Sequence, residues 1–488
     1  MENIDTTRNG FTNLRKECAT YAAAIKATGD KFGADVAPGD FKPGGQMKTA
    51  LMLAMAAWAA EIAAAPFAVT ISDGHHDALY RVGEKAQFTL TAKDLAKDAA
   101  SSGGVVSVSM DNFGDKVLLK KDWKPSEEPS LVVEGTLDEP GFLRVKAMSQ
   151  ARPAGSLWGL GKGNVCWSVG YAPEKIMAGS ARPADFDAYW DGERARLARE
   201  VPLDMRRMKV DAMCNDSFDV WRLSCATFNG KRTWGFLVSP KNANGPLPLH
   251  VNIPGAGSAT SEAGTRHFMR PGEMHLVLNV HPFEPAKDAA GQKKLYEEQD
   301  RECAKKYGCN YAIAGGAVGR EDFFFHDALL GIDRAVAWAA ALPEVDRTRI
   351  VYSGGSQGGG MGIMLCALNP AITRAVFFVP ALTDLCGFKA GGRQSGWPSL
   401  VERQKTSAAK EKATAIAPYF DAAHFAPRVK IPVRVVVGFS DTTCPPPCVY
   451  AAYNALGGRD KGIRNVPGMG HSSRPEVRSE MDKWLRSR

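Results

Sequence analysis

The sequence predicts an α/β protein with a doubly wound, mostly parallel sheet, preceded by a small all-β sandwich domain. After about residue 180, buried apolar runs alternate with amphipathic helical segments, which is typical of a parallel sheet covered on both faces. Between about residues 66 and 175, short runs alternate apolar and polar residues between Gly, Asp and Pro clusters. That pattern indicates the short strands of an immunoglobulin-like sandwich.

Length and composition agree with two folded units. The chain has 488 residues, more than one hydrophobic core usually supports. Hydrophobic residues make up 44% and charged residues 23%, which is the balance of an ordinary globular protein. The formal charge of +8 comes from Lys and Arg scattered along the chain without a dense basic run. We therefore expect no nucleic-acid partner.

The segment 47–65 has the pattern of a signal peptide. A lysine follows Met47, an apolar run extends to Ala60, and small residues stand in A-x-A spacing. Residues 1–46 would then be an extension from a wrongly chosen start codon, and the mature protein would be exported to the periplasm or the exterior. The alternative is a buried alanine-rich helix. The run is shorter than a membrane span, so we expect no membrane anchor.

Cysteine usage depends on this export. An oxidising compartment would allow disulfides between cysteines that are close in sequence. The candidate pairs are Cys303/Cys309, Cys444/Cys448 and Cys214/Cys225. No C-x-x-C or Cys/His cluster has zinc spacing, so we expect no metal.

The α/β part, residues 180–488, should begin with a helix. Asp185 is a plausible N-cap for a helix that includes Glu193 to Glu200. Buried strands are expected at Leu249–Ile253, Leu276–Val280, Ile350–Ser353, Ala375–Val379 and Val433–Val437. Helices are expected from Asp327 to Ala341 and from Gln357 to Leu368.

A candidate nucleophile stands where one of these strands meets a helix. The β-branched run from Ile350 leads into G-x-S-x-G, with Ser356 at its centre, and then into a helix. Side chains at Gly354 and Gly358 would clash with neighbouring backbone in the strained turn that exposes such a serine. A phosphate-binding loop is the alternative, but neither G-x-G-x-x-G nor G-x-x-x-x-G-K is present. The α/β-hydrolase fold is therefore favoured.

A serine hydroxyl needs a histidine to take its proton and an acid to orient that histidine. In this fold the chain order is Ser, then Asp or Glu, then His. Asp441 follows a buried strand, and His471 follows the next short strand. Both should lie on loops at the carboxyl edge of the sheet. Asp384 also follows a strand and is the chief rival for the acid.

The oxyanion of such a reaction needs two fixed donors. The first candidate is the backbone N–H of Gln357, directly after the nucleophile. The second is the N–H of Ala256, in a glycine-containing turn that follows a strand. This turn could equally be no more than a tight connection.

These motifs resemble the acetyl xylan esterase and cephalosporin C deacetylase family of carbohydrate esterases. The likeness lies in GGSQGGG at 354–360, Asp441 with the following TTCPPPCVYAAYNAL, Tyr419-Phe420-Asp421 with Ala426-Pro427-Arg428, and Gly470-His471. It implies that Ser356, Asp441 and His471 form a catalytic triad, that Gln357 and Ala256 supply oxyanion amides, and that O-acetyl groups on sugars are the substrates. It implies no cofactor.

The chain departs from the family pattern at two loops. Pro254-Gly255-Ala256 stands where the family shows His-Gly-Tyr, and the segment around His281 stands where it shows Arg-Gly-Gln. Together with the segment 392–398 and the N-terminal sandwich, this is similar to a longer branch of the family.

An acetyl ester needs a small apolar pocket beside the nucleophile. Phe324 in the Phe323–Phe325 run, Trp397 and His281 are the candidates for its walls, although such aromatics could instead be core residues. The connection Thr383–Pro418 is long enough to cover the site as a cap.

The sequence thus predicts a serine carboxylesterase that deacetylates a small-molecule or oligosaccharide ester through an acetyl-enzyme. Two other functions remain open: a prolyl-oligopeptidase-like peptidase, which shares the fold and triad order, and a glycan-binding protein that has lost catalysis. The sandwich could serve binding, packing or the formation of a homo-oligomer.

Overall fold

The computed structural model describes residues 67–71, 74–92, 105–149 and 164–487. The predicted extension at 1–46 and signal peptide at 47–65 lie outside these residues. Residues Phe67–Arg488 belong to one compact unit. Within its described part, no helix is both long and apolar enough to cross a membrane.

Two sheets form the N-terminal part. The first has the strand order β1 (Phe67–Ile71), β3 (Ala86–Ala92), β6 (Ser130–Gly135). The second has the order β2 (Leu79–Tyr80), β8 (Asn164–Tyr171), β7 (Gly141–Ser149), β4 (Val106–Asp111), β5 (Val117–Trp123). All pairs are antiparallel except β2 with β8. Buried and less buried positions alternate along β4 and β6, as the period-2 pattern predicts. That the two sheets form a sandwich domain ending near residue 175 stays a prediction.

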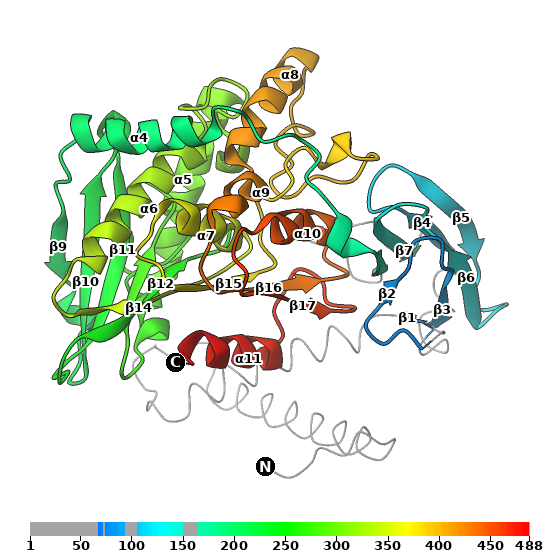
Figure 1. The fold of residues 1–488 in the computed structure, drawn as a ribbon, viewed down its shortest axis with the longest axis horizontal. Coiled ribbons are helices and arrows are strands. Elements are labelled where there is room, and N and C mark those ends of the chain that lie inside the picture. The colour runs from blue at the N-terminus through cyan, green and yellow to red at the C-terminus, as the bar shows by residue number, and fades with distance from the viewer. Residues whose placement is uncertain (1–66, 72–73, 93–104, 150–163, 488) are drawn as a thin grey trace, which may run out of the picture. The chain divides into compact units, whose positions relative to one another are not determined.

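A nine-stranded sheet organises the rest of the chain (Figure 1). Its order is β17 (Lys461–Val466), β16 (Val433–Gly438), β15 (Arg374–Phe378), β14 (Val345–Gly355), β12 (Leu247–Ile253), β13 (Met274–Leu278), β11 (Arg232–Pro240), β10 (Phe218–Ala226), β9 (Arg206–Lys209). The pairs from β13 to β17 are parallel, and β9, β10 and β11 add an antiparallel edge. The prediction of a mostly parallel sheet is confirmed for this part of the chain.

Strand β13 ends earlier than expected. The sequence predicts Leu276–Val280, but the strand pairs with β12 from Met274 and is buried at every position. A strand buried on both faces has no alternation that marks its ends, so the two-residue error follows from the pattern itself.

Helices cover both faces of the sheet. They are α4 (Phe186–Glu200), α5 (Ala289–Tyr307), α6 (Phe324–Ala340), α7 (Gln357–Leu368), α8 (Ser407–Ile416), α9 (Ala422–Phe425), α10 (Pro446–Ala455) and α11 (Pro475–Arg486). Short 3-10 helices occur at Pro173–Lys175, Asp211–Met213, Phe228–Gly230, Ala263–Phe268, Tyr311–Ile313, Gly387–Lys389, Ala417–Phe420 and Ala426–Arg428. In Figure 1, α6 and α7 lie on one face and α11 on the other. Asp185 occupies the N-cap position of α4, but its carboxylate accepts from the Tyr419 hydroxyl instead of capping the helix.

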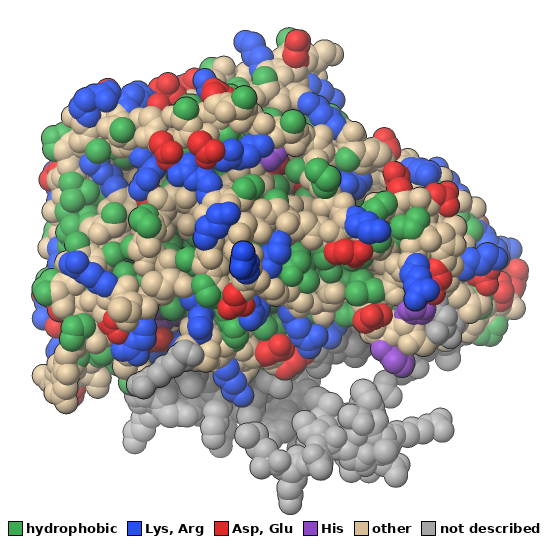
Figure 2. All heavy atoms as spheres, viewed as in Figure 1, with side chains coloured by type: hydrophobic (Ala, Val, Ile, Leu, Met, Phe, Trp, Pro, Cys, Tyr) green, Lys and Arg blue, Asp and Glu red, His purple; other side chains and the backbone are tan. Residues whose placement is uncertain are grey.

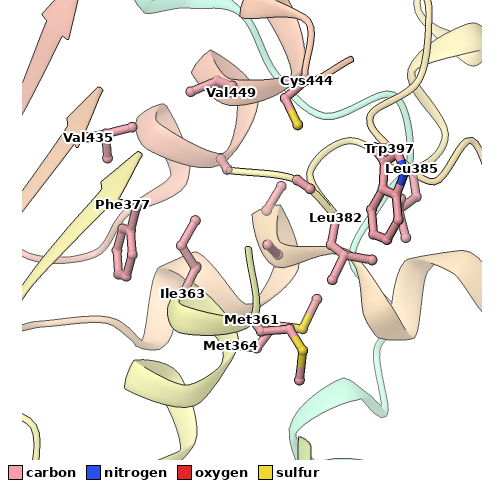
Figure 3. Packing of buried hydrophobic residues seen from close by; sticks show 14 of the residues in the cluster. Met361, Ile363, Met364, Phe377, Leu382, Leu385, Trp397, Val435, Cys444 and Val449 are labelled. Carbon is pink, nitrogen blue, oxygen red and sulfur yellow. The ribbon is translucent and has the colours of Figure 1, made fainter. Parts of the chain in front are cut away.

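The core holds α7 against the centre of the sheet. Every residue of α7 is buried. Figure 3 shows Met361, Ile363 and Met364 of this helix in one cluster with Phe377 of β15 and Trp397 of the long connection. The helix therefore fixes the position of the residue immediately before it, Ser356.

The surface carries mixed charge. On the face that Figure 2 shows, Lys and Arg side chains are interspersed with Asp and Glu. This face has no continuous basic patch of the kind that nucleic-acid binding requires.

Candidate active site

Ser356 occupies a strained turn between β14 and α7. Its φ of 56° and ψ of −123° cost a residue with a side chain about 1–3 kcal/mol. The backbone around it compensates, because the Ser356 N–H donates to the Phe378 carbonyl at 2.9 Å and the Ser356 carbonyl accepts from Ala381 at 2.9 Å. The end of β15 therefore holds the serine in place.

The flanking glycines are required by close backbone packing, as the sequence predicts. A Cβ at Gly358 would overlap the Ile253 carbonyl at the end of β12, and one at Gly354 would lie 2.7 Å from the Gly358 carbonyl carbon. The first turn of α7 can therefore press directly against two neighbouring strand ends.

The structure brings Ser356, His471 and Asp441 together. His471 Nε2 lies 2.9 Å from Ser356 Oγ, and His471 Nδ1 lies 2.8 Å from Asp441 Oδ2. Asp441 is fully buried, and its Oδ1 accepts the N–H groups of Thr443 and Cys444 at 2.8 and 2.9 Å. A buried carboxylate on Nδ1 keeps the proton there and leaves Nε2 free to accept one from the serine.

Asp384, the rival acid, is engaged elsewhere. Its Oδ2 accepts from Arg393 Nη2 at 2.7 Å, and its Oδ1 accepts the Gly179 N–H at 2.7 Å. Both residues of this ion pair are buried. The contacts of Asp384 are those of a structural carboxylate.

The two candidate oxyanion donors come from neighbouring segments. Gln357 is the first residue of α7, and the turn that contains Ala256 runs beside the serine: a Cβ at Gly255 would stand 3.7 Å from the Ser356 Cβ. The buried Gln357 side chain accepts a hydrogen bond from the Tyr311 hydroxyl at 2.8 Å. That bond fixes the start of the helix.

His281 supports this turn. It is fully buried, and its Nε2 lies 2.9 Å from the Gly257 carbonyl. Burial lowers the pKa of His281 to about 4, so the neutral ring can donate Nε2–H to that carbonyl. The ring packs among aromatic side chains that include Tyr311 and Phe324.

The other two candidates for pocket walls lie in the surrounding core. Phe324 contacts the Tyr311 ring at a centroid distance of 5.0 Å, and Trp397 packs edge-on against Phe325 at 6.3 Å. Within the described residues, Phe324, Trp397 and His281 make no hydrogen bond or ring contact with Ser356, Asp441 or His471. Their role as pocket walls stays a prediction.

Cys444 is a neighbour that the sequence analysis did not place in the site. Its sulfur and the ligand atoms of Asp441 and His471 all lie within 4.8 Å of one another. Burial holds the pKa of the Cys444 thiol well above its usual range, and Asp441 adds to this shift. The thiol therefore stays protonated beside the serine. Its position three residues after Asp441 was the one feature of the sequence that could have placed it near the acid.

None of the three candidate pairs forms a disulfide among the described residues, where all nine cysteines are free. The thiols have other partners. Cys448 Sγ donates to the Gln394 carbonyl at 3.1 Å, and Cys225 Sγ donates to the Gly331 carbonyl at 3.6 Å. Closeness in sequence was therefore not enough to predict a disulfide.

A second buried polar cluster lies at the middle of β12 and the start of β13. His250, Glu273 and His275 each offer one ligand atom within 4.8 Å of the others. Arg486 already neutralises Glu273 through two contacts of 3.0 Å. Although burial raises the pKa of Glu273, hydrogen bonds from His275 and Arg486 hold it below its usual range. The cluster is thus charge-balanced without a metal.

His250 should make the fold sensitive to acid. Burial lowers its pKa from 6.5 to about 3, with a smaller effect of His275 in the same direction. A depressed histidine pKa contributes stability that is present above 6.5 and is lost as pH falls towards 3, because only the unfolded chain takes up the proton. The loss per pH unit is at most about 1.4 kcal/mol for this group.

His250→Gln should therefore flatten the dependence of unfolding free energy on pH between 6.5 and 3, measured by urea denaturation. His76→Gln, at an exposed position, is the matched control and should keep the wild-type slope. Equal slopes in both variants would contradict the account.

A serine at a strand-to-helix turn, linked through a histidine to a buried aspartate at one edge of a mostly parallel sheet, defines a protein of the α/β-hydrolase type. Residues 174–488 match the model of the family described as "Acetyl xylan esterase (AXE1)". The chain therefore belongs to the acetyl xylan esterase family, a family of carboxylic ester hydrolases. This confirms the resemblance that the motifs carry.

Individual relatives agree with this family. The chain is 29% identical over 391 residues to acetyl esterase Axe7A of Xylanibacter ruminicola, covering 78% of this chain and 82% of that protein. The acetyl xylan esterase from Paenibacillus sp. R4 superposes with a TM-score of 0.54 at 22% identity, covering 64% of this chain and 97% of its own. Acetyl xylan esterase 1 from Thermoanaerobacterium sp. JW/SL YS485 superposes with a TM-score of 0.54 at 21% identity, covering 64% of this chain and 98% of its own. The two solved structures share the fold.

Proposed function

We propose that this protein is a serine esterase that removes O-acetyl groups from carbohydrates through an acetyl-enzyme. The observation that carries the proposal is the continuous hydrogen-bonded chain from Ser356 Oγ through His471 to the buried Asp441. Membership of the acetyl xylan esterase family supports the choice of an acetyl ester over a peptide.

The proposed reaction has two halves. His471 Nε2 takes the Ser356 proton as Oγ attacks the acetyl carbonyl carbon, and the backbone N–H groups of Gln357 and Ala256 donate to the resulting oxyanion. The C–O bond to the sugar breaks, and His471 protonates the departing alcohol. Water then attacks the acetyl-enzyme with His471 again as base, which releases acetate and restores Ser356.

Asp441 stabilises the imidazolium form of His471 in both halves. Its second oxygen is held by two backbone N–H groups, so the carboxylate cannot rotate away from the ring. The neighbouring Cys444 is a protonated thiol and is not proposed as a nucleophile. Phe324, Trp397 and His281 are proposed to shape the acyl side of the site.

We also propose a domain organisation and an export signal for this chain. Residues 66–175 would form a sandwich domain and 180–488 the hydrolase domain, with export directed by the segment 47–65. Mass spectrometry of the protein purified from whole cells and medium of an expressing bacterium would give the mature N-terminus. A chain that begins after residue 65 supports export, and one that retains 1–65 contradicts it.

The test of function is an acetate-release screen. Acetylated xylan, acetylated xylo-oligosaccharides, glucose pentaacetate and cephalosporin C are offered beside an aminoacyl-nitroanilide, and a fluorophosphonate probe reports on the nucleophile. We expect acetate release from the carbohydrate esters and labelling at Ser356. Nitroanilide cleavage without acetate release would replace the proposal by a peptidase, and absence of both labelling and turnover would leave a binding protein.

A further inference from the structure

We propose that strand β8 (Asn164–Tyr171), in the N-terminal segment Phe67–Tyr171, helps to position the catalytic centre. In this proposal Trp167 and Ser168, neighbours on β8, position the two loops that carry His471 and Asp441. The inference rests on the proposed roles of those two residues. It assigns the segment a task in catalysis, in place of a separate binding or dimerisation role.

The first contact is to the loop that carries Asp441. Ser168 is fully buried, and its hydroxyl donates to the carbonyl of Phe439, two residues before Asp441. The Phe439 ring meets Phe142 of β7 edge-on at a centroid distance of 5.0 Å. Both β7 and β8 therefore hold the start of this loop.

The second contact is to the loop that carries His471. Gly468, three residues before the histidine, has a φ of +68°, and a Cβ there would overlap the six-membered ring of Trp167. The indole thus lies directly on the loop backbone. Trp167 Nε1 is buried without a hydrogen-bond partner in the described part of the chain, so ring packing carries this contact.

The two loops also hold each other. The Ser440 N–H donates to the Met469 carbonyl at 2.9 Å, and a Cβ at Gly438 would lie 2.5 Å from that carbonyl oxygen. A shift of either loop is therefore passed to the other. Trp167 and Ser168 restrain this pair from the side of the all-β segment.

Gln394, in the long connection after β15, forms a third link. Its Nε2 donates at 2.7 Å to the carbonyl of Thr442, the residue directly after Asp441. Its backbone N–H donates to the Phe113 carbonyl at 2.9 Å. Arg144 Nη1 approaches the Gln394 Oε1 at 3.5 Å and is itself held by two hydrogen bonds to buried Asp111. This link reaches the acid through charged residues of β4 and β7.

Trp167 and Ser168 lie outside the part of the chain that the family model matches. The family match begins at residue 174, after β8. The two solved acetyl xylan esterases are covered almost completely by 64% of this chain. The Axe7A alignment covers 78% of the chain, which is more than residues 174–488 contain, so it extends into the preceding segment. The β8 contacts therefore join residues before the matched part to the two loops within it.

Positioning has a large effect on rate, because a displacement of about 1 Å at a catalytic group can reduce turnover about 100-fold. Trp167→Ala should therefore lower kcat on p-nitrophenyl acetate about 10- to 100-fold and leave KM within about twofold. Trp167→Phe should recover most of the loss, since a ring again covers Gly468. Ser168→Ala should lower kcat in the same way but by less.

The matched control is Leu90→Ala, which removes a fully buried side chain from β3 in the other sheet of the segment. It should lower the melting temperature and leave kcat per folded molecule unchanged, with the folded fraction taken from circular dichroism. Wild-type kcat in folded Trp167→Ala, or the same kcat loss in Leu90→Ala, would overturn the inference. Failure of the proposed function would differ, because the wild-type protein itself would then release no acetate.

Discussion

Ser356→Ala is expected to lower kcat/KM for p-nitrophenyl acetate by about 10⁴- to 10⁶-fold, because no other described group can take over the attack. The neighbouring Cys444 thiol is held protonated by burial. Alanine keeps the Cβ of serine, so the backbone strain at φ 56° is the same in both proteins. The variant should therefore fold normally, and steady-state kinetics with acetate detection would measure the loss.

Ser353→Ala is the matched control on the same strand. The Ser353 hydroxyl lies 2.7 Å from His250 Nε2, in the buried cluster away from His471. Its loss should cost about 1 kcal/mol of stability and leave kcat unchanged. If Ser356→Ala retained substantial turnover while Ser353→Ala lost it, the nucleophile would have to be sought elsewhere.

Much of the fold could be predicted because its central elements are marked by chemistry as well as by periodicity. Glycines and a serine mark the junction of β14 and α7, and α7 has the predicted bounds Gln357–Leu368. At the antiparallel edge, β9 is exposed at every position and has the sequence Arg-Arg-Met-Lys. It therefore has no apolar pattern that would predict a strand. Pairing with β10 makes it a strand, and this pairing cannot be read from the residues of β9 alone.

The candidate site also contains residues that could be predicted from the sequence and residues whose contacts could not. That Ser356, Asp441 and His471 lie together could be predicted because the fold imposes an order and places each after a strand. The roles of supporting residues depend on contacts across hundreds of positions, such as that of Trp167 with Gly468. The place of His281 after a strand suggests a position in the pocket, but its contact with the Gly257 carbonyl could not be read from that place. Local sequence specifies which residues can react, and tertiary packing specifies how they are held.

Asp441→Asn is expected to lower kcat about 10⁴-fold at neutral pH with little change in shape. Asp441 Oδ1 accepts two backbone N–H groups, so the amide oxygen of asparagine should take that side and its NH₂ should face His471 Nδ1. Facing a donor, Nδ1 must accept, and the ring proton moves to Nε2. A histidine protonated at Nε2 cannot remove the proton of Ser356, so the rate constant for acetylation should fall in stopped-flow measurements.

Asp384→Asn separates this effect from a general loss of a buried carboxylate. Asp384 is as buried as Asp441, and breaking its pair with Arg393 should cost about 3–5 kcal/mol of stability. Its kcat per folded molecule should nevertheless stay close to wild type, since the tautomer of His471 is untouched. The reverse outcome, a catalytic loss in Asp384→Asn with retained turnover in Asp441→Asn, would transfer the acid to Asp384. Stability and turnover thus respond to different carboxylates, because one balances a buried arginine and the other orients the base.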